Sequence, residues 1–301
     1  MKYRPSQFYS GALIALVAIS LFSAKAVMVK LAYRYEVDHL TLLLLRMVFA
    51  FPFYVAIAFL YKGQHRGKIG PKDYFWLILL GFFGYYLASL FDFIGLQYIK
   101  AGLERIILFV YPTIVVLLNK WIFKQPISSQ QWWAIGITYL GVVITFYPEA
   151  QFFGESVYKG GAFVFLSALC FALYIAGSGQ LIPRFGVVRF TAYGMMASTF
   201  FVVAHYLIKG DGQALNQPME VYGLGIAMAV LATLVPSFMT SEAIKRLGSS
   251  TYSIFGGWGP VSTILLAFFL LDERIGWVQW LGMGVVISGI AILSKRRDIG
   301  H

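Results

Sequence analysis

Five charged residues stand inside long apolar stretches of the chain, where ionised side chains are costly and therefore usually functional. They are Lys25, Arg46, Asp92, Glu104 and Arg105, three cations and two anions. Isolated in hydrocarbon, the five would together cost on the order of 10 kcal/mol, so they must pair, reach water or line a cavity. The chemistry they predict is a hydrated vestibule with a positive bias, suited to a metabolite that carries a carboxylate.

Each of these residues also has a structural interpretation. Lys25 and Arg105 have long side chains that can extend to the membrane interface. Glu104 falls in the first turn of its expected helix, where a carboxylate favours the helix dipole. Arg46 lies deeper and is expected either to pair with Asp92 or Glu104 or to contact a ligand. Asp92 is the best candidate for proton coupling, with a salt bridge to Arg46 as the equal alternative.

Aromatic residues on two expected helices, 101–121 and 249–271, are predicted to wall a pocket at the middle of the membrane. This requires that the two helices face each other across an axis that relates the two halves of the chain. The alternative for each ring is ordinary packing in the core. Together with two of the charges they make up the residues predicted to bind substrate, which are Arg46, Glu104, Tyr111, Tyr252, Phe255 and Trp258.

The same two helices are predicted to bend near their middles. Each carries a proline, Pro112 in one and Pro260 in the other. A proline inside a helix removes a backbone donor and kinks the helix. Gly256 and Gly257 precede the second proline and allow close approach and bending. These four residues are the predicted hinge.

The elements that must position these residues are membrane-spanning helices. Hydrophobic residues make up 59% of the chain and charged residues 12%, against roughly 45–50% and 25% in soluble domains. The composition predicts an integral membrane protein with the lipid bilayer as its partner. The net charge of +11 fits a membrane-orientation signal better than nucleic-acid binding. The motifs of hydrolases, metalloproteases and P-loop proteins are missing, so we expect no enzyme, no cofactor and no metal site.

Spanning a bilayer takes about 20 apolar residues in a helix, and long apolar runs of this kind recur along the chain. The first is expected to be a retained helix, not a cleaved signal peptide, because a similar segment recurs inside the chain at 161–185. The expected spans are 11–31, 40–60, 74–97, 101–121, 131–147, 160–182, 189–208, 221–243, 249–271 and 276–294.

The chain repeats itself. The stretch 112–141 returns at 260–289, 148 residues later, and 11–35 aligns with 161–185 at an offset of 150. Such a long period indicates duplication of a whole module and not a solenoid. The predicted units are residues 1–150 and 151–301, each with five helices. The predicted fold is therefore an all-α membrane protein of ten transmembrane helices.

Lysines and arginines fall unequally on the two sides of these spans. Fifteen lie on one side and seven on the other, and the richer side is normally cytoplasmic. Both termini are therefore expected in the cytoplasm. Because five helices per module is an odd number, the second module enters from the opposite side. The two modules are predicted to be inverted repeats, an architecture that suits secondary transporters.

A proline, an L-x-E pattern and a Q-x-x-G pattern recur in the repeated block, and this combination resembles the EamA-type branch of the drug/metabolite transporter superfamily. The resemblance spans nearly the whole chain. It departs in the first copy, where Gln125 stands at the position of Glu273. The residues that carry it are Pro260, 270–275 (LLDERI), Gln279, Gly282 and Gly289, with Pro112, Ile127, Gln131 and Gly136 in the first copy.

The resemblance implies ten helices, alternating access and export of small metabolites, often amino acids. The sequence thus predicts a secondary transporter in a bacterial inner membrane whose substrate is an amino-acid-like small molecule, with proton coupling as an open alternative. A flippase for a lipid-linked substrate is the second interpretation. A membrane-embedded acyltransferase is the third, and it lacks a catalytic constellation.

Overall fold

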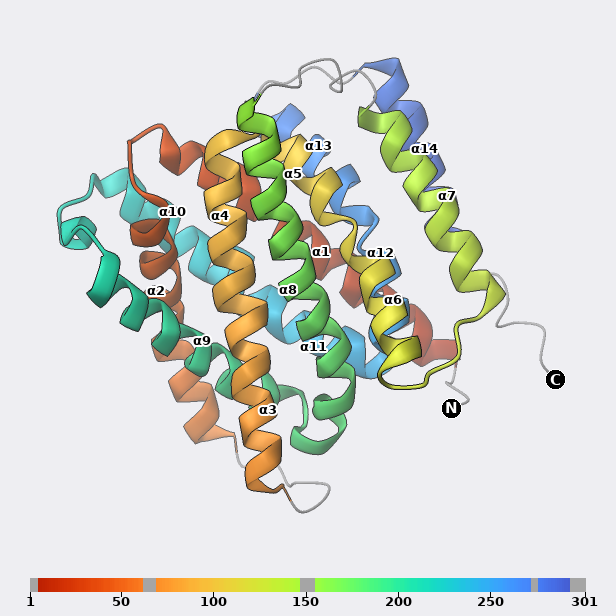
Figure 1. The fold of residues 1–301 in the computed structure, drawn as a ribbon, viewed down its shortest axis with the longest axis horizontal. Coiled ribbons are helices and arrows are strands. Elements are labelled where there is room, and N and C mark those ends of the chain that lie inside the picture. The colour runs from red at the N-terminus through yellow and green to blue at the C-terminus, as the bar shows by residue number, and fades with distance from the viewer. Residues whose placement is uncertain (1–4, 62–68, 147–154, 272–275, 293–301) are drawn as a thin grey trace.

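The computed structural model describes residues 5–61, 69–146, 155–271 and 276–292, and these residues form helices and short connections without a strand (Figure 1). Glu273 lies outside the described residues. The helices are α1 (Pro5–Tyr33), α2 (His39–Leu60), α3 (Pro71–Gly81), η1 (Phe82–Leu87), α4 (Ala88–Tyr98), α5 (Ala101–Leu108), α6 (Tyr111–Trp121), α7 (Ser129–Phe146), α8 (Glu155–Phe185), α9 (Val187–Lys209), η3 (Gln213–Leu215), α10 (Met219–Ala229), η4 (Val230–Leu234), α11 (Val235–Leu247), α12 (Ser249–Phe255), α13 (Trp258–Leu271) and α14 (Trp277–Ile292).

Eight of the continuous helical stretches among the described residues are long and apolar enough to cross a membrane. They include the stretches that carry Lys25, Arg46, Asp92, Glu104 and Arg105. The helices α7 and α14, which cover the expected spans 131–147 and 276–294, are not among the eight, and α14 has only 16 residues. They lie side by side at one edge of the molecule (Figure 1). The multi-pass architecture is confirmed, and the count of ten spans stays a prediction.

The first helix of each half packs against the other half of the chain. Gly11 of α1 lies against α11, where an added Cβ would stand 2.9 Å from the Cβ of Arg246. Gly160 of α8 lies against α4, where an added Cβ would stand 2.8 Å from the Cβ of Tyr98. Tyr98 and Arg246 are separated by the same 148 residues as the repeated block. The first helix of each half therefore packs closely on the third helix of the other half.

Helix interruptions also repeat at matched positions. The π-helical turns η1 and η4 begin at Phe82 and Val230, again 148 residues apart. The break between α5 and α6 falls at residues 109–110, and the break between α12 and α13 falls at 256–257. A proline two or three residues after each break withholds the N–H that would have continued the helix. The residues predicted as a hinge lie at or next to these breaks, and their bending stays a prediction.

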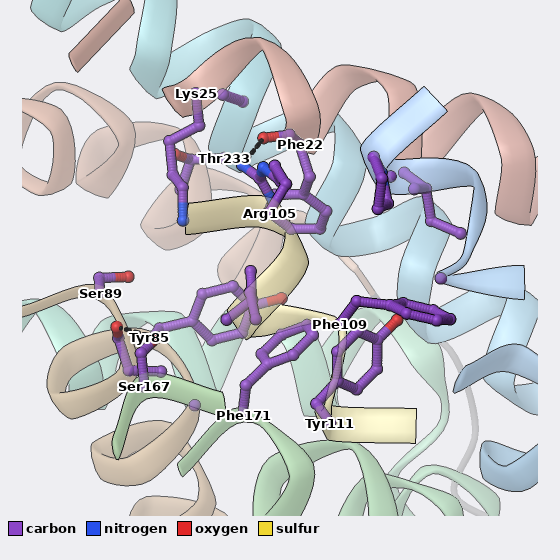
Figure 2. Close-up of a pocket in the computed structure, with 18 of the residues that line it drawn as sticks. Phe22, Lys25, Tyr85, Ser89, Arg105, Phe109, Tyr111, Ser167, Phe171 and Thr233 are labelled. Carbon is purple, nitrogen blue, oxygen red and sulfur yellow. Dashed lines mark hydrogen bonds between the residues drawn. The ribbon is translucent and has the colours of Figure 1, made fainter. Parts of the chain in front are cut away.

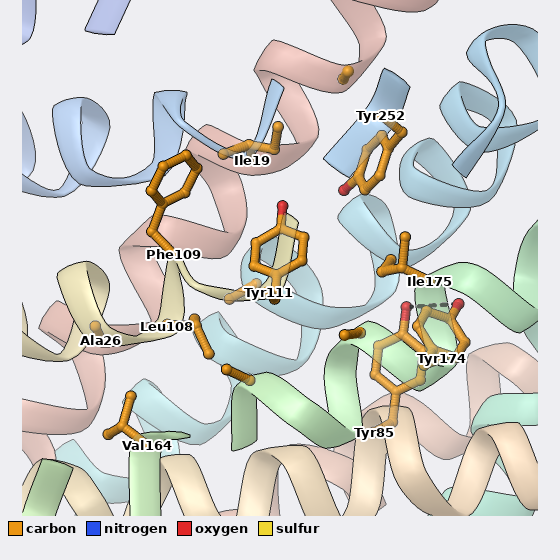
Figure 3. Close-up of a cluster of buried hydrophobic side chains, with 14 of the residues drawn as sticks. Ile19, Ala26, Tyr85, Leu108, Phe109, Tyr111, Val164, Tyr174, Ile175 and Tyr252 are labelled. Carbon is orange, nitrogen blue, oxygen red and sulfur yellow. Dashed lines mark hydrogen bonds between the residues drawn. The ribbon is translucent and has the colours of Figure 1, made fainter. Parts of the chain in front are cut away.

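The centre of the molecule is an apolar core in which several tyrosine hydroxyls find partners (Figure 3). The Tyr174 hydroxyl donates to that of Tyr85 at 3.3 Å, and the two rings meet edge to face with centroids 4.9 Å apart. Tyr252 and Thr240 share a hydrogen bond of 2.9 Å. These bonds matter because a buried polar group without a partner is costly. The core therefore combines apolar packing with hydroxyl groups that can face a central cavity.

Candidate binding cavity and buried charge cluster

A cavity of about 80 Å³ lies at the centre of the bundle, between the interrupted helices of both halves (Figure 2). We call it the central cavity. Its wall combines three cationic side chains with hydroxyls and aromatic rings. The lining residues are Ile19, Phe22, Lys25, Arg46, Gly84, Tyr85, Ala88, Ser89, Arg105, Leu108, Phe109, Tyr111, Ser167, Phe171, Ala232, Thr233, Tyr252, Gly256, Gly259 and Pro260.

Residues at matched positions of the internal repeat line this cavity. Several lining residues of the first half have their counterpart 148 residues later, and the counterpart also lines the cavity. The pairs come from the π turns η1 and η4 and from the two helix breaks. The cavity therefore lies where the matched irregularities of the two halves meet. The matched pairs are Gly84 with Ala232, Tyr85 with Thr233, Leu108 with Gly256, and Tyr111 with Gly259.

Arg46 lines the cavity from α2 and is only 2% exposed. Its Nη2 donates to Ser89 Oγ at 2.8 Å, and its guanidinium stands 5.1 Å from the centre of the Phe93 ring. Its Nε meets no acceptor. Within the described part of the chain, no carboxylate lies at ion-pair distance from Arg46. A buried guanidinium held this way keeps donors free for a carboxylate.

Lys25 is the ion-pair partner of Asp92. The Lys25 Nζ lies 2.6 Å from Asp92 Oδ2, and the two side chains are 12% and 1% exposed. Of the two roles expected for Arg46, the pair with Asp92 is therefore not formed. The physical reason is proximity, because α1 brings a lysine to the carboxylate while Ser89 and Phe93 hold the arginine. Lys25 itself faces the central cavity and does not extend to the surface (Figure 2).

Glu104 and Arg105, which are adjacent in α5, form a second buried pair. Arg105 Nε lies 3.1 Å from Glu104 Oε2, and its Nη2 donates to the Phe22 carbonyl of α1 at 3.1 Å. Glu104 lies in the first turn of α5, as expected, and its side chain is completely buried. It is absent from the cavity wall, whereas Arg105 is part of it. Arg105 is thus anchored between α5 and α1 with its charge toward the cavity.

The carboxyl groups of Asp92 and Glu104 lie within hydrogen-bonding reach of each other. Two carboxylates cannot form such a bond, because each can only accept. When both are ionised, their four oxygens meet no hydrogen-bond donor of good geometry, although two of the oxygens touch the cations of their ion pairs. A single shared proton turns the contact into a hydrogen bond and removes the like-charge repulsion.

The predicted aromatic wall is formed in part. Tyr111 and Tyr252 line the cavity, while Phe255 and Trp258 do not belong to its wall. Trp258 instead donates its Nε1 hydrogen to Ser20 Oγ on α1 at 2.8 Å, because the N–H of a half-buried indole needs an acceptor. Phe255 is 2% exposed and belongs to the apolar core.

Of the residues predicted as the hinge, Gly256 and Pro260 line the cavity, while Pro112 and Gly257 do not. Several lining residues were not singled out from the sequence. Two signals could have found some of them. Ser89 precedes Asp92 by three residues and so shares its helix face. Thr233 is the counterpart of Tyr85 at the repeat offset. The others, including Ser167 and Phe171 of α8, become neighbours of the site only through tertiary packing.

A second cavity of about 510 Å³ lies between α3, α6 and α8, and we call it the side groove. Its walls are largely apolar, and one end carries Lys72 and the ion pair of Asp73 with Arg184. The turn η1 separates it from the central cavity, since Phe83 lines the groove and Tyr85 lines the cavity. The π turn is thus the partition between the two spaces.

Comparison with known proteins gives consistent matches over nearly the whole chain. The sequence model of the EamA-like transporter family matches residues 9–147 and again residues 158–295. The uncharacterized transporter YcbK of Bacillus subtilis (strain 168) is 29% identical over 294 residues, covering 96% of this chain and 94% of that protein. The uncharacterized transporter sll1319 of Synechocystis sp. is 25% identical, covering 95% and 94%. A solved crystal structure, 15% identical, shares the fold with a TM-score of 0.77 over 95% of this chain and 98% of its own.

Proposed function

This chain belongs to the EamA-like transporter family, and from that premise we propose that it is a secondary transporter that exports amino acids or similar small organic metabolites by alternating access. The ligand class rests on the cavity wall. Lys25, Arg46 and Arg105 all line it, while the nearby carboxyl groups of Asp92 and Glu104 stand behind it. A space with this arrangement of charge favours a substrate carboxylate.

The single observation that carries the proposal is Arg46. A completely buried guanidinium that is held by a serine and an aromatic ring, and that lacks a carboxylate at ion-pair distance among the described residues, is costly to keep for stability alone. A ligand carboxylate would complete its coordination with two parallel hydrogen bonds. The remaining polar groups of a small metabolite face hydroxyls with capacity left: Ser89 accepts from Arg46 and can still donate, and Ser167 donates to the Ala88 carbonyl and can still accept. The Tyr111 hydroxyl also lines the cavity.

Alternating access is supported by the repeated irregularities around the cavity. Interrupted helices around a central site are the usual construction of carriers built from inverted repeats. Here each half supplies one π turn and one broken helix to the same cavity. We propose that ten spans form two inverted five-helix repeats in a bacterial inner membrane, with both termini in the cytoplasm. In this orientation the side groove, at the N-terminal end of α3, opens toward the cytoplasm and leads substrate to the partition at η1. The export direction rests on the family resemblance.

The test is counterflow in proteoliposomes with a panel of labelled amino acids. Saturable exchange of one class supports the transporter and identifies its ligand. If folded wild-type protein exchanges no member of the panel, the proposed substrate class is wrong, and a lipid-linked substrate becomes the better hypothesis. Competition by unlabelled soluble analogues separates the two, since a soluble compound cannot compete for a site that admits lipid-linked molecules from the bilayer.

Arg46 variants test the site itself. We expect Arg46→Ala to abolish exchange without loss of insertion. Arg46→Lys retains the charge but cannot make two parallel bonds, so we expect weak exchange with a raised KM. Arg34→Ala is the matched control, because Arg34 is exposed and lies outside both the central cavity and the side groove. Flux of Arg46→Ala equal to that of the wild type would refute the assignment of Arg46 to the substrate site.

A further inference from the structure

The most unusual chemistry in the molecule is the contact between two buried carboxyl groups. Asp92 of α4 and Glu104 of α5 are both 0% exposed and lie within hydrogen-bonding reach of each other. Each also touches a cation, Lys25 for Asp92 and Arg105 for Glu104. Two like charges at such a distance in a medium of low dielectric constant favour the uptake of one proton between them.

Other groups complete the surroundings of this pair. Arg46 from α2 acts on Asp92 from a greater distance than Lys25, and among the described residues Tyr33 from α1 is a further titratable neighbour. The Tyr33 hydroxyl is already engaged, because it donates to the Phe93 carbonyl at 2.7 Å. With both carboxyl groups ionised, three cations face two anions. One added proton leaves three cations facing a single anion.

We infer that the Asp92–Glu104 pair is a proton-binding site and that its proton is co-transported with a substrate carboxylate. The link between the two ligands is the pair of cations that separates them. Lys25 and Arg105 touch the carboxyl pair on one side and line the central cavity on the other (Figure 2). Protonation of the pair leaves these cations less neutralised, so a carboxylate in the cavity binds more tightly.

Thermodynamic linkage makes this effect reciprocal. If the proton strengthens binding of the carboxylate, the carboxylate strengthens binding of the proton by the same factor, which is roughly 5- to 150-fold for typical couplings. A substrate whose only charge is its carboxylate leaves with the proton without net movement of charge, whereas a zwitterionic amino acid and its proton carry one net positive charge. This inference rests on the proposed function, and it names the coupling ion. Movement of proton and substrate in the same direction is compatible with export. A metabolite that accumulates inside the cell leaves down its own concentration gradient and carries the proton with it.

The proton site can be tested without knowing the substrate. Infrared spectroscopy of the purified full-length protein reports the C=O stretch of a protonated carboxyl group, which shifts in heavy water. We expect this band at neutral pH in the wild type and its loss in Glu104→Gln and in Asp92→Asn. Glu242→Gln is the matched control, because Glu242 is also paired with an arginine but stands outside the cluster. Absence of the band from the wild type, or its persistence in both cluster variants, overturns the inference.

Transport tests the coupling. Proteoliposomes are given an acidic exterior and the labelled amino acid that the wild type exchanges. With the membrane potential held at zero, coupling of one proton to one substrate molecule accumulates the substrate about tenfold inside for each pH unit of gradient, since each unit is a tenfold ratio of protons. In Glu104→Gln we expect the final ratio to fall to one, whatever the transport rate of that variant. Because the final ratio is an equilibrium property, a slow but folded variant still gives the answer.

The outcomes separate this inference from the proposed function. Wild-type exchange without accumulation under the gradient overturns proton coupling and leaves the transporter intact. Accumulation under an alkaline exterior shows that proton and substrate compete, which overturns the proposed sign. If the folded wild type exchanges no amino acid, the proposed function fails, and the infrared result alone decides whether Asp92 and Glu104 hold a proton.

Discussion

The contact between Tyr111 and Gly256 is the sharpest test of how the two broken helices meet. Gly256 ends α12 with φ −54° and ψ −21°, a conformation that alanine adopts without strain. An added Cβ would stand 1.8 Å from Tyr111 Oη, whereas ordinary contacts begin at 3.4 Å. The cost of Gly256→Ala is therefore steric. We expect it to destabilise the protein by about 1–3 kcal/mol, the usual range for overpacking in a dense core.

A second substitution should relieve this clash. Tyr111→Leu removes the hydroxyl and the ring edge that occupy the space of the new methyl group. In the double variant, the coupling between Tyr111 and Gly256 should recover roughly 0.5–3 kcal/mol. The recovery is incomplete, because the Ser253 carbonyl at 2.7 Å still limits the space beside Gly256. The measurement is the thermal unfolding midpoint of the detergent-solubilised protein, followed by size-exclusion chromatography.

Gly136→Ala is the matched control for Gly256→Ala. Gly136 lies in α7, and an added Cβ meets nothing within 4 Å. Alanine there should be neutral or stabilising by up to about 1 kcal/mol, because alanine has the higher helix propensity. If Gly256→Ala unfolds at the same temperature as the wild type, α6 and α12 do not meet as described, and the geometry of the central cavity must be revised.

Two further substitutions test the buried polar contacts by the same unfolding measurement. Asn119→Ala should cost about 1–3 kcal/mol, because the buried Asn119 Nδ2 donates to Ser249 Oγ at 2.9 Å and Ser250 Oγ at 2.8 Å and so joins α6 to α12; an unchanged midpoint would mean that this junction adds nothing to stability. Lys25→Met should cost about 3–5 kcal/mol by leaving Asp92 buried without its cation, and the double variant Lys25→Met/Asp92→Asn should be more stable than Lys25→Met alone. Equal stability of the single and double variants would contradict the ion pair.

Much of the architecture could be predicted from the sequence because it follows from composition and repetition. The apolar runs predicted membrane-spanning helices, and eight are found among the described residues. The offset of 148 residues, read from the block that starts at Pro112 and Pro260, also relates the π turns and the helix breaks. The span count depends on α7 and α14, whose lengths are near the limit for crossing a bilayer.

For the site, the sequence could predict which charged residues take part but not which of them contact one another. The sequence identified the charged residues, since ionised groups in apolar runs are conspicuous. It left Asp92 with two interpretations, because distances between side chains on different helices depend on how the helices pack. In the structure Asp92 forms an ion pair with Lys25, Arg46 donates a hydrogen bond to Ser89, and the Trp258 indole donates one to Ser20.

Composition and internal repetition are enough to predict a duplicated bundle of membrane helices with charged residues inside the apolar runs of its first half. Those properties are local or periodic, and apolar length, proline position and repeat offset are visible along the chain. The pairing of the charges, the choice of those that line the central cavity, and the contact of Asp92 with Glu104 depend on how the helices pack. Such contacts join residues of separate helices, and their distances are set by the packing of every helix between them.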